Sequence, residues 1–188
     1  HEDAIYFSKR VTRAVPDGGP IEAHTDLVKK LDYECELAVV LGRDARDVPA
    51  GQTRDYIFGY TILNDVSARD VQTAHKQWYF GKSLDGFTPI GPCIVTADAF
   101  ADYPPRLGIR SFVNGEKRQD SNTALQIFDI DHVIAELSQG MTLKAGTIIA
   151  TGTPAGVGMG MDPPQFLKPG DVVRCEIDGI GTLTNPVK

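Results

Sequence analysis

The amino-acid sequence predicts a mostly β protein with a few short helices. Its 19 glycines and 12 prolines are spread between short runs of β-forming residues, a composition typical of many turns and short elements. A regular alternation of acidic and apolar residues starts at residue 31, as in a half-buried strand. The chain has 188 residues, of which 41% are hydrophobic, so it has the size and composition of one domain. No linker divides residues 1–188.

Several segments have the length and composition of strands. The first, residues 31–41, alternates and then becomes a continuous apolar run ending at Gly42, as expected of a strand that enters a core. The second, residues 56–63, ends at Asn64 and Asp65. The dipeptide Asn114-Gly115 predicts a tight hairpin between two others. The remaining predicted strands are residues 93–96, 107–113, 116–119, 147–151, 171–177 and 181–184.

Two helices are predicted. Residues 130–139 carry apolar side chains at helical spacing, and Gly140 follows as a stop signal. Ser67 lies three residues before Asp70, which is the spacing of a helical N-terminal cap. A short helix starting there would carry Arg69 and Gln72 on one face.

Charge and composition exclude several classes of function. The net charge is −6 and no cluster of Lys and Arg offsets it, which argues against a nucleic-acid partner. No apolar stretch is long enough to span a membrane. The cysteines Cys35, Cys93 and Cys175 are widely spaced, without a CxxC pair, and are expected to be reduced core thiols of a cytoplasmic protein. Residue 1 is His, so we expect an upstream segment.

Three carboxylates share one face of the first predicted strand. Side chains alternate along a strand, so Asp32, Glu34 and Glu36 project from the same side. Such crowded carboxylates repel one another unless a cation compensates them, and all-oxygen ligation favours Mg²⁺, Mn²⁺ or Ca²⁺. Asp65, at the end of another apolar strand, is a candidate further ligand. The alternatives are a solvated strand face for the alternating acids and a turn or cap for Asp65.

Other polar residues could serve the same site. Arg69 and Gln72 would offer a cationic fork and an amide to a carboxylate substrate, and Lys82 follows three aromatic residues and a glycine. Their alternatives are an exposed helix face and a surface lysine. The glycine-rich segment 151–160 follows a strand and could bind a small carboxylate, or it could be a plain turn. It lacks the ending of a phosphate-binding loop.

The histidines and nucleophiles give weaker signals. His75, three residues after Gln72, is the internal candidate for a general base by position, with a surface histidine as its alternative. His132 falls in the predicted helix and is expected to be structural. The chain carries no signature of a serine or cysteine nucleophile.

From residue 31 to its end, the chain resembles the fumarylacetoacetate hydrolase family. The resemblance is carried by several separated motifs in order: DYECELAVV at residues 32–40, GYTILNDVSARDVQ at 59–72, GKS at 81–83, VNGE at 113–116 and TGTP at 151–154. It implies the fold of the family's C-terminal catalytic domain, a mixed β-sandwich roll with short helices, commonly assembled as a homodimer.

The resemblance also implies a ligand set. Glu34, Glu36 and Asp65 match the residues that bind Mg²⁺ or Mn²⁺ in the family, with Ca²⁺ as a further occupant in crystals, whereas Asp32 matches a neighbour of the ligands. Substrate-binding positions of the family correspond to Arg69, Gln72, Lys82 and Thr153, and Arg69 and Lys82 would offset negative charge during catalysis. The expected substrate is a small oxo-acid, as in the breakdown of aromatic compounds.

The chain departs from the family pattern at the acid–base pair. The family carries a His-x-x-Glu motif on a lid upstream of this region, and the adjacent His1 and Glu2 do not supply it. We therefore expect the general base to lie upstream of His1. The leading expectation is metal-dependent hydrolysis of a carbon–carbon bond in an acylpyruvate or related 1,3-dicarbonyl acid. The alternatives are an isomerase or tautomerase, an oxaloacetate-type decarboxylase, and a non-catalytic binder of metal and oxo-acid.

Overall fold

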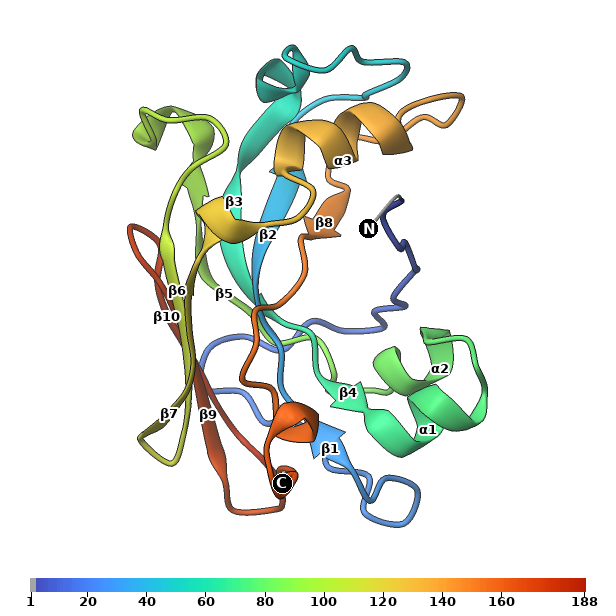
Figure 1. The fold of residues 1–188 in the computed structure, drawn as a ribbon, viewed down its shortest axis with the longest axis vertical. Helices are drawn as coiled ribbons and strands as arrows, with labels where there is room; N and C mark the ends of the chain where they lie inside the picture. The colour runs from blue at the N-terminus through green and yellow to red at the C-terminus, as the bar shows by residue number, and fades with distance from the viewer. Residues whose placement is uncertain (1–2) are drawn as a thin grey trace.

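The structure, a computed structural model, describes residues 3–188, and these residues form a sandwich of two antiparallel sheets (Figure 1). Each sheet has four strands, and a short pair, β1 with β4, lies beside them. The first sheet has the order β5 (Ile90–Thr96), β3 (Ile57–Asn64), β2 (Cys35–Leu41), β8 (Ile148–Ala150). The second has the order β10 (Gly181–Pro186), β9 (Val172–Ile177), β6 (Gly108–Val113), β7 (Glu116–Asn122). The short pair is β1 (Leu31–Asp32) and β4 (Ser67–Ala68).

Helices make up little of the described chain, as the sequence predicts. They are α1 (Arg69–Ala74), α2 (Tyr79–Lys82) and α3 (Ile130–Leu137), with single-turn 3₁₀ segments elsewhere. Helices α1 and α2 lie together beside β4, whereas α3 lies at the other end of the molecule near β8 (Figure 1). With 8 residues, α3 is the longest helix of residues 3–188, so none there could cross a membrane.

The space between the two sheets holds the core. All seven residues of β2 are buried, which explains why its sequence changes from alternation to a continuous apolar run. Leu37 and Val39 of β2 belong to the same buried cluster as Ile109 of β6 and Val173 of β9. Because β2 is central and buried on both faces, a polar side chain on it is held in a dry environment, and this governs the chemistry of Glu36.

The predicted hairpin between β6 and β7 is confirmed. Asn114 and Gly115 both have positive φ angles, 52° and 84°, the backbone of a two-residue turn whose twist matches the flanking strands. Asn tolerates this conformation and glycine adopts it without strain.

Replacing Gly115 with Ala is expected to destabilise the protein by about 1 kcal/mol, because a Cβ at a positive φ is strained. No heavy atom lies within 4 Å of the point that the new Cβ would occupy, so the cost is conformational and involves no clash. Urea unfolding of the variant measures it, and an unchanged free energy of unfolding would contradict the assignment.

Three local predictions need correction. The predicted strand 31–41 is interrupted after Asp32 and resumes at Cys35. Ser67 does not cap α1: it pairs with Asp32 in the short sheet, and its hydroxyl donates to the carbonyl of Asp65. The capping position belongs to Ala68, which makes no side-chain cap. Cys93 is exposed on β5 rather than buried, while Cys35 and Cys175 are buried free thiols, as expected.

Candidate metal centre

Three buried carboxylates converge where β2 begins and β3 ends. Glu36 lies on β2, Glu34 directly precedes that strand, and Asp65 follows β3. The antiparallel register places Cys35 opposite Asn64, and the backbone N–H of Asp65 donates to the carbonyl of Glu34 at 2.8 Å. One oxygen from each of the three carboxylates lies within 4.8 Å of the others. This spacing and the all-oxygen donor set fit a hard divalent cation such as Mg²⁺ or Mn²⁺.

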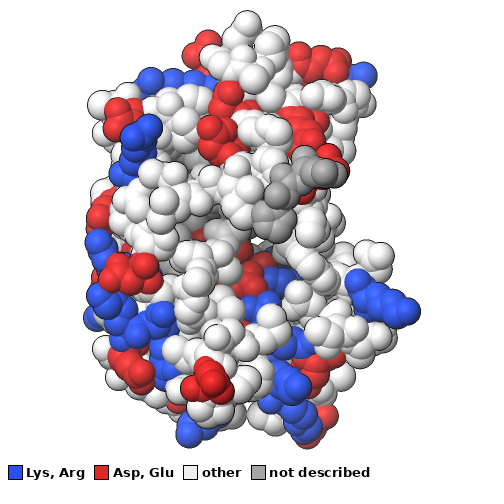
Figure 2. Space-filling view, in the orientation of Figure 1, with Lys and Arg blue, Asp and Glu red and all other residues white. Residues whose placement is uncertain are grey.

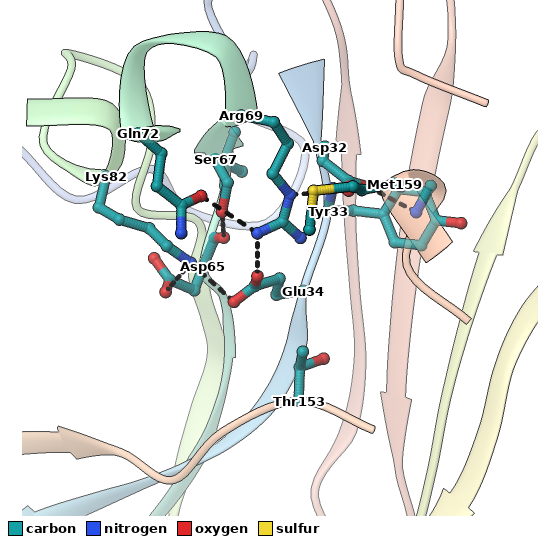
Figure 3. A network of polar contacts seen from close by, with 12 residues as sticks. Asp32, Tyr33, Glu34, Asp65, Ser67, Arg69, Gln72, Lys82, Thr153 and Met159 are labelled. Atoms are coloured by element: carbon teal, nitrogen blue, oxygen red, sulfur yellow. Dashed lines mark hydrogen bonds and ion pairs between the residues drawn. The ribbon is translucent and has the colours of Figure 1, made fainter. Parts of the chain in front are cut away.

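Two of these carboxylates are paired with cationic side chains (Figure 3). Lys82 donates to Glu34 at 2.8 Å and to Asp65 at 2.7 Å. Arg69 lies 2.6 Å from the other oxygen of Glu34, and Lys9 lies 2.6 Å from the other oxygen of Asp65. Burial alone would raise the pKa of Asp65, but Lys9 and Lys82 hold it below its ordinary value. Likewise, burial would lower the pKa of Lys82, and the two carboxylates outweigh that effect and raise it.

Glu36 is the member of the trio that lacks a cationic partner among the described residues. Its carboxylate accepts a hydrogen bond from the backbone N–H of Gly152 at 2.8 Å. Burial, followed by repulsion from Asp65 and Glu34, places the pKa of Glu36 well above its ordinary value. A divalent cation beside Glu36 would supply the missing positive charge. The electrostatics and the donor set therefore both fit a metal at this position.

Asp32 is a neighbour of the trio and has its own partners. Its carboxylate accepts from Arg69 Nε at 2.9 Å and from the backbone N–H groups of Gly158 and Met159 at 2.7 and 2.9 Å. These bonds hold Arg69 in place from one side while Glu34 holds it from the other (Figure 3). The geometry thus makes Asp32 a residue that positions Arg69, in agreement with the neighbouring role that the family resemblance implies.

Helices α1 and α2 bring Gln72 and Lys82 together beside Arg69 and the carboxylate trio. Gln72 Oε1 accepts from Arg69 Nη1 at 3.2 Å, so the two residues share one face of α1, as expected. Gly81 packs directly on the backbone of Gln72, where an added Cβ would lie 2.6 Å from its nitrogen. The glycine before Lys82 therefore allows the two helices to approach closely enough for Lys82 to reach the carboxylates.

Polar groups of the glycine-rich segment 151–160 form hydrogen bonds with other residues of the protein. Its N–H groups at Gly152 and Gly158 donate to Glu36 and Asp32. Thr153 lies apart from the ionic network in Figure 3; its hydroxyl donates to the carbonyl of Cys35 at 2.9 Å and accepts from Gln119 at 2.8 Å. In this state the segment acts as a support for the carboxylates, and binding of a substrate by Thr153 stays a prediction.

The trio lies at the floor of a cavity of about 1220 Å³. Figure 2 shows acidic and basic atoms at the bottom of a hollow near the centre of one face, bordered mostly by uncharged residues. One wall is the segment from Ala4 to Lys9, which runs past the site without regular structure. Tyr6 binds Glu136 of α3, and Phe7 packs edge-on against Trp78 at 5.2 Å, so this segment is attached on both sides of the cavity.

Sequence reasoning missed Lys9, and of its two readings of His75 the structure supports the surface histidine. Lys9 lines the cavity beside Asp65, although it lies 56 residues away in the chain and in a segment with no periodic pattern. His75 is exposed, packs against Phe80 at 5.3 Å and does not line the cavity. His132 is also exposed and stacks on Phe128 at 4.9 Å. His1 and Glu2 lie outside the described residues.

Known proteins share this sequence and fold. The family model described as "Fumarylacetoacetate (FAA) hydrolase C-terminal" matches residues 1–188. The oxaloacetate tautomerase YisK of Bacillus subtilis is 45% identical over 186 residues, which are 99% of this chain and 62% of that protein.

Solved structures agree with this match. The structure of a fumarylacetoacetate hydrolase from psychrophilic Exiguobacterium antarcticum superposes with a TM-score of 0.89 at 51% identity, covering 92% of this chain and 62% of that one. A 5-carboxymethyl-2-hydroxymuconate delta-isomerase from Mycobacterium smegmatis gives a TM-score of 0.88 at 42% identity, covering 100% and 70%. The chain thus spans under two thirds of the length of the curated relative. The match over its whole length shows that the chain belongs to the fumarylacetoacetate hydrolase family.

Proposed function

We propose that Glu34, Glu36 and Asp65 bind Mg²⁺ or Mn²⁺ and that the site converts a small 2-oxo acid into its enolate. The observation that supports this proposal most directly is the buried carboxylate trio, flanked by three cationic side chains, at the floor of a large cavity. When bound, the divalent cation would polarise the carbonyl of the substrate and lower the energy of its enolate.

The side chains of this site supply the remaining charge and orientation. Lys82 is held on two carboxylates, and Lys9 is held on Asp65 at the cavity wall. Their ammonium groups would offset the negative charge that develops when a proton leaves the carbon next to the carbonyl. Arg69, fixed by Asp32 and Glu34, would orient the substrate carboxylate together with Gln72. Because these groups are already positioned by protein contacts, they need little reorganisation during the reaction.

Keto–enol tautomerisation is the outcome that we favour. This reaction moves a proton within one acid and consumes no water. The names of two relatives, an oxaloacetate tautomerase and a hydroxymuconate isomerase, support the same outcome.

Hydrolysis of a carbon–carbon bond is the second candidate. It is supported by the relative at 51% identity that is named a fumarylacetoacetate hydrolase. In the hydrolysis of an acylpyruvate, water adds to the acyl carbonyl and the adjacent carbon–carbon bond breaks, which releases the enolate of pyruvate as the leaving group. Loss of CO₂ from oxaloacetate would release the same pyruvate enolate. Hydrolysis additionally requires a water molecule that attacks the acyl carbonyl, whereas both hydrolysis and tautomerisation require a general base.

Removal of divalent cations is expected to lower the rate of tautomerisation on the order of 100-fold or more, because such a cation supplies several kcal/mol of charge stabilisation. The protein is treated with a chelator and then titrated with Mn²⁺ or Mg²⁺. Ultraviolet absorbance follows the enol of oxaloacetate or acetylpyruvate, and NMR identifies the products.

The products distinguish the possible outcomes. An equilibrated keto–enol mixture indicates a tautomerase, whereas acetate with pyruvate, or CO₂ with pyruvate, indicates hydrolysis or decarboxylation. Undiminished activity after exhaustive chelation would contradict the proposal. Mn²⁺ binding without any reaction would identify a non-catalytic binder.

A further inference from the structure

Gln119 of β7 is a buried amide that reaches from the second sheet to the metal-ligand segment of the first. It is 0% exposed. Its Oε1 accepts from the backbone N–H of Cys35 at 3.1 Å and from Ser111 Oγ at 2.8 Å. Its Nε2 donates to Thr153 Oγ1 and to the carbonyl of Pro154, both at 2.8 Å. These four bonds use every donor and acceptor site of the amide, so its orientation is fixed.

The bond to Cys35 takes the place of a strand contact. Strand β8 stops pairing with β2 at Ala150, which lies opposite Ala38. The same register, continued along the chain, would bring Thr153 opposite Cys35, but β8 ends before that position. Side chains complete the bonding there: the hydroxyl of Thr153 donates to the carbonyl of Cys35 at 2.9 Å, and Gln119 accepts from its N–H. The backbone of Cys35 is therefore held by side chains on this side.

Cys35 separates two of the candidate metal ligands. It lies between Glu34 and Glu36, so a displacement of its backbone would move both carboxylates. On the opposite side of this segment, the N–H of Asp65 donates to the carbonyl of Glu34 at 2.8 Å. Alternate residues of a strand direct their backbone groups to opposite sides. Gln119 therefore restrains the part of the ligand segment that the contacts with β3 do not reach.

A second route leads from Gln119 to the carboxylate of Glu36. The bonds from Nε2 to Thr153 and Pro154 fix the segment that follows β8. Gly152 of this segment has a φ of 93°, which turns the chain away from the path of the strand. Its N–H then donates to the carboxylate of Glu36 at 2.8 Å. One amide thus fixes both the backbone that carries Glu36 and the donor that orients its side chain.

We infer that Gln119 is a positioning residue of the metal centre, which sets the separation of Glu34 and Glu36 and the orientation of Glu36 without binding the ion itself. This inference rests on the proposed function, because it takes the carboxylate trio as the ligand set. Groups that orient metal ligands through hydrogen bonds commonly change metal affinity by about 10-fold to 100-fold. Loss of Gln119 should therefore change the metal centre as well as the stability of the fold.

Replacing Gln119 with Met tests the inference, because Met has a similar length and no amide. After treatment with a chelator, calorimetry with Mn²⁺ alone should give an affinity about 10-fold to 100-fold below that of the wild type. Electron paramagnetic resonance at saturating Mn²⁺ should show an altered zero-field splitting, because the carboxylates would surround the ion with a different geometry. An affinity and a spectrum equal to those of the wild type would overturn the inference.

Ser111→Ala is the matched control. It removes the other hydrogen bond to the same oxygen of Gln119, also at a fully buried position, and leaves the bond to Cys35 in place. Both variants should lower the Tm, since each leaves a buried polar group with fewer partners. Ser111→Ala should keep the wild-type Mn²⁺ affinity and spectrum. Equal losses of Mn²⁺ affinity in the two variants would assign the effect to general destabilisation and overturn the inference.

Gln119→Asn provides a second variant. It keeps an amide but shortens the side chain by one methylene, so the amide reaches Cys35 and Thr153 less well. It should weaken Mn²⁺ binding and alter the spectrum, as Gln119→Met does. If neither variant folds while Ser111→Ala does, Gln119 serves the stability of the sandwich and the inference is overturned.

Glu36→Gln separates failure of the inference from failure of the proposed function. If Glu36→Gln binds Mn²⁺ as tightly as the wild type, the trio is not the metal site and the proposed function fails with the inference. If Glu36→Gln loses Mn²⁺ while Gln119→Met keeps the wild-type affinity and spectrum, the inference fails and the proposed function stands. A weakened and altered metal centre in Gln119→Met, with no turnover of any oxo-acid by the wild type, would support the inference and overturn the proposed reaction.

Discussion

Replacing Glu36 with Gln is expected to weaken Mn²⁺ binding by 100-fold or more while leaving the metal-free protein at least as stable as the wild type. Glu36 is buried, and none of the ion pairs of residues 3–188 includes it. Gln has the same shape, and its amide oxygen can still accept the N–H of Gly152. The variant therefore lacks one charged metal ligand, which weakens the binding of a divalent cation by several kcal/mol. It also lacks a buried negative charge, which removes an unfavourable contribution to the stability of the metal-free protein. Mn²⁺ calorimetry measures the first effect.

Thermal unfolding measures the second effect. Mn²⁺ should raise the Tm of the wild type, because a ligand that binds only the folded state stabilises it, and should leave the Tm of Glu36→Gln nearly unchanged. Glu116→Gln, at an exposed position, is the matched control and should keep the full response to Mn²⁺. A Glu36→Gln variant that retains wild-type Mn²⁺ affinity would show that Glu36 is not a ligand.

The same substitution should change how stability depends on pH. Burial and the neighbouring carboxylates raise the pKa of Glu36 in the folded protein above its value in the unfolded chain. The folded state therefore binds more protons between these two values, and the stability of the metal-free wild type should fall as pH rises through this window. Glu36→Gln should remove that part of the slope. Urea unfolding at a series of pH values in a chelator tests this, and an identical slope in both proteins would contradict the assignment.

The sequence predicts the sandwich well because its signals are local. Alternation and apolar runs mark β2 and β3, and Asn114-Gly115 marks the turn between β6 and β7. The break before β2 leaves no such signal. There, the backbone N–H of Glu34 donates to the side chain of Asn64 at 2.9 Å, a contact between positions 30 residues apart. The continuous pattern over residues 31–41 conceals this break because side-chain contacts of this kind do not alter hydrophobic periodicity.

The candidate site shows the same division between local and long-range information. Strand alternation groups Glu34 with Glu36, and it also includes Asp32. Asp65 is a candidate from its place at the end of the next apolar strand, and the family motifs, rather than the periodicity, select it over Asp32. Lys9 could not be identified, because its role depends on the path of an irregular segment across the cavity. The predicted helix cap at Ser67 is wrong because Ser67 pairs with Asp32 and therefore lies in an extended strand. Helix α2, with four residues, is too short to produce a helical pattern.

Replacing Lys82 with Met is expected to destabilise the metal-free protein by about 3 to 5 kcal/mol, the usual cost of removing one partner from a buried ion pair. Lys82 is 1% exposed and is bound to both Glu34 and Asp65, so its loss leaves two buried carboxylates with less compensation. Met fills much of the same volume, which keeps the packing contribution small. Urea unfolding in a chelator measures the effect.

Mn²⁺ separates the electrostatic cause from a packing defect. If uncompensated carboxylates cause the loss, saturating Mn²⁺ should stabilise Lys82→Met more than it stabilises the wild type, because the cation supplies charge where the ammonium is absent. Lys117→Met removes an exposed lysine that is paired with Asp120 and should cost less than about 1 kcal/mol, with no added response to Mn²⁺. A loss below about 1 kcal/mol in Lys82→Met, or an Mn²⁺ response no larger than that of the wild type, would show that Lys82 does not neutralise the carboxylates. A larger stabilisation by Mn²⁺ in Lys82→Met than in the wild type would indicate that Lys82 and the cation neutralise the same carboxylates.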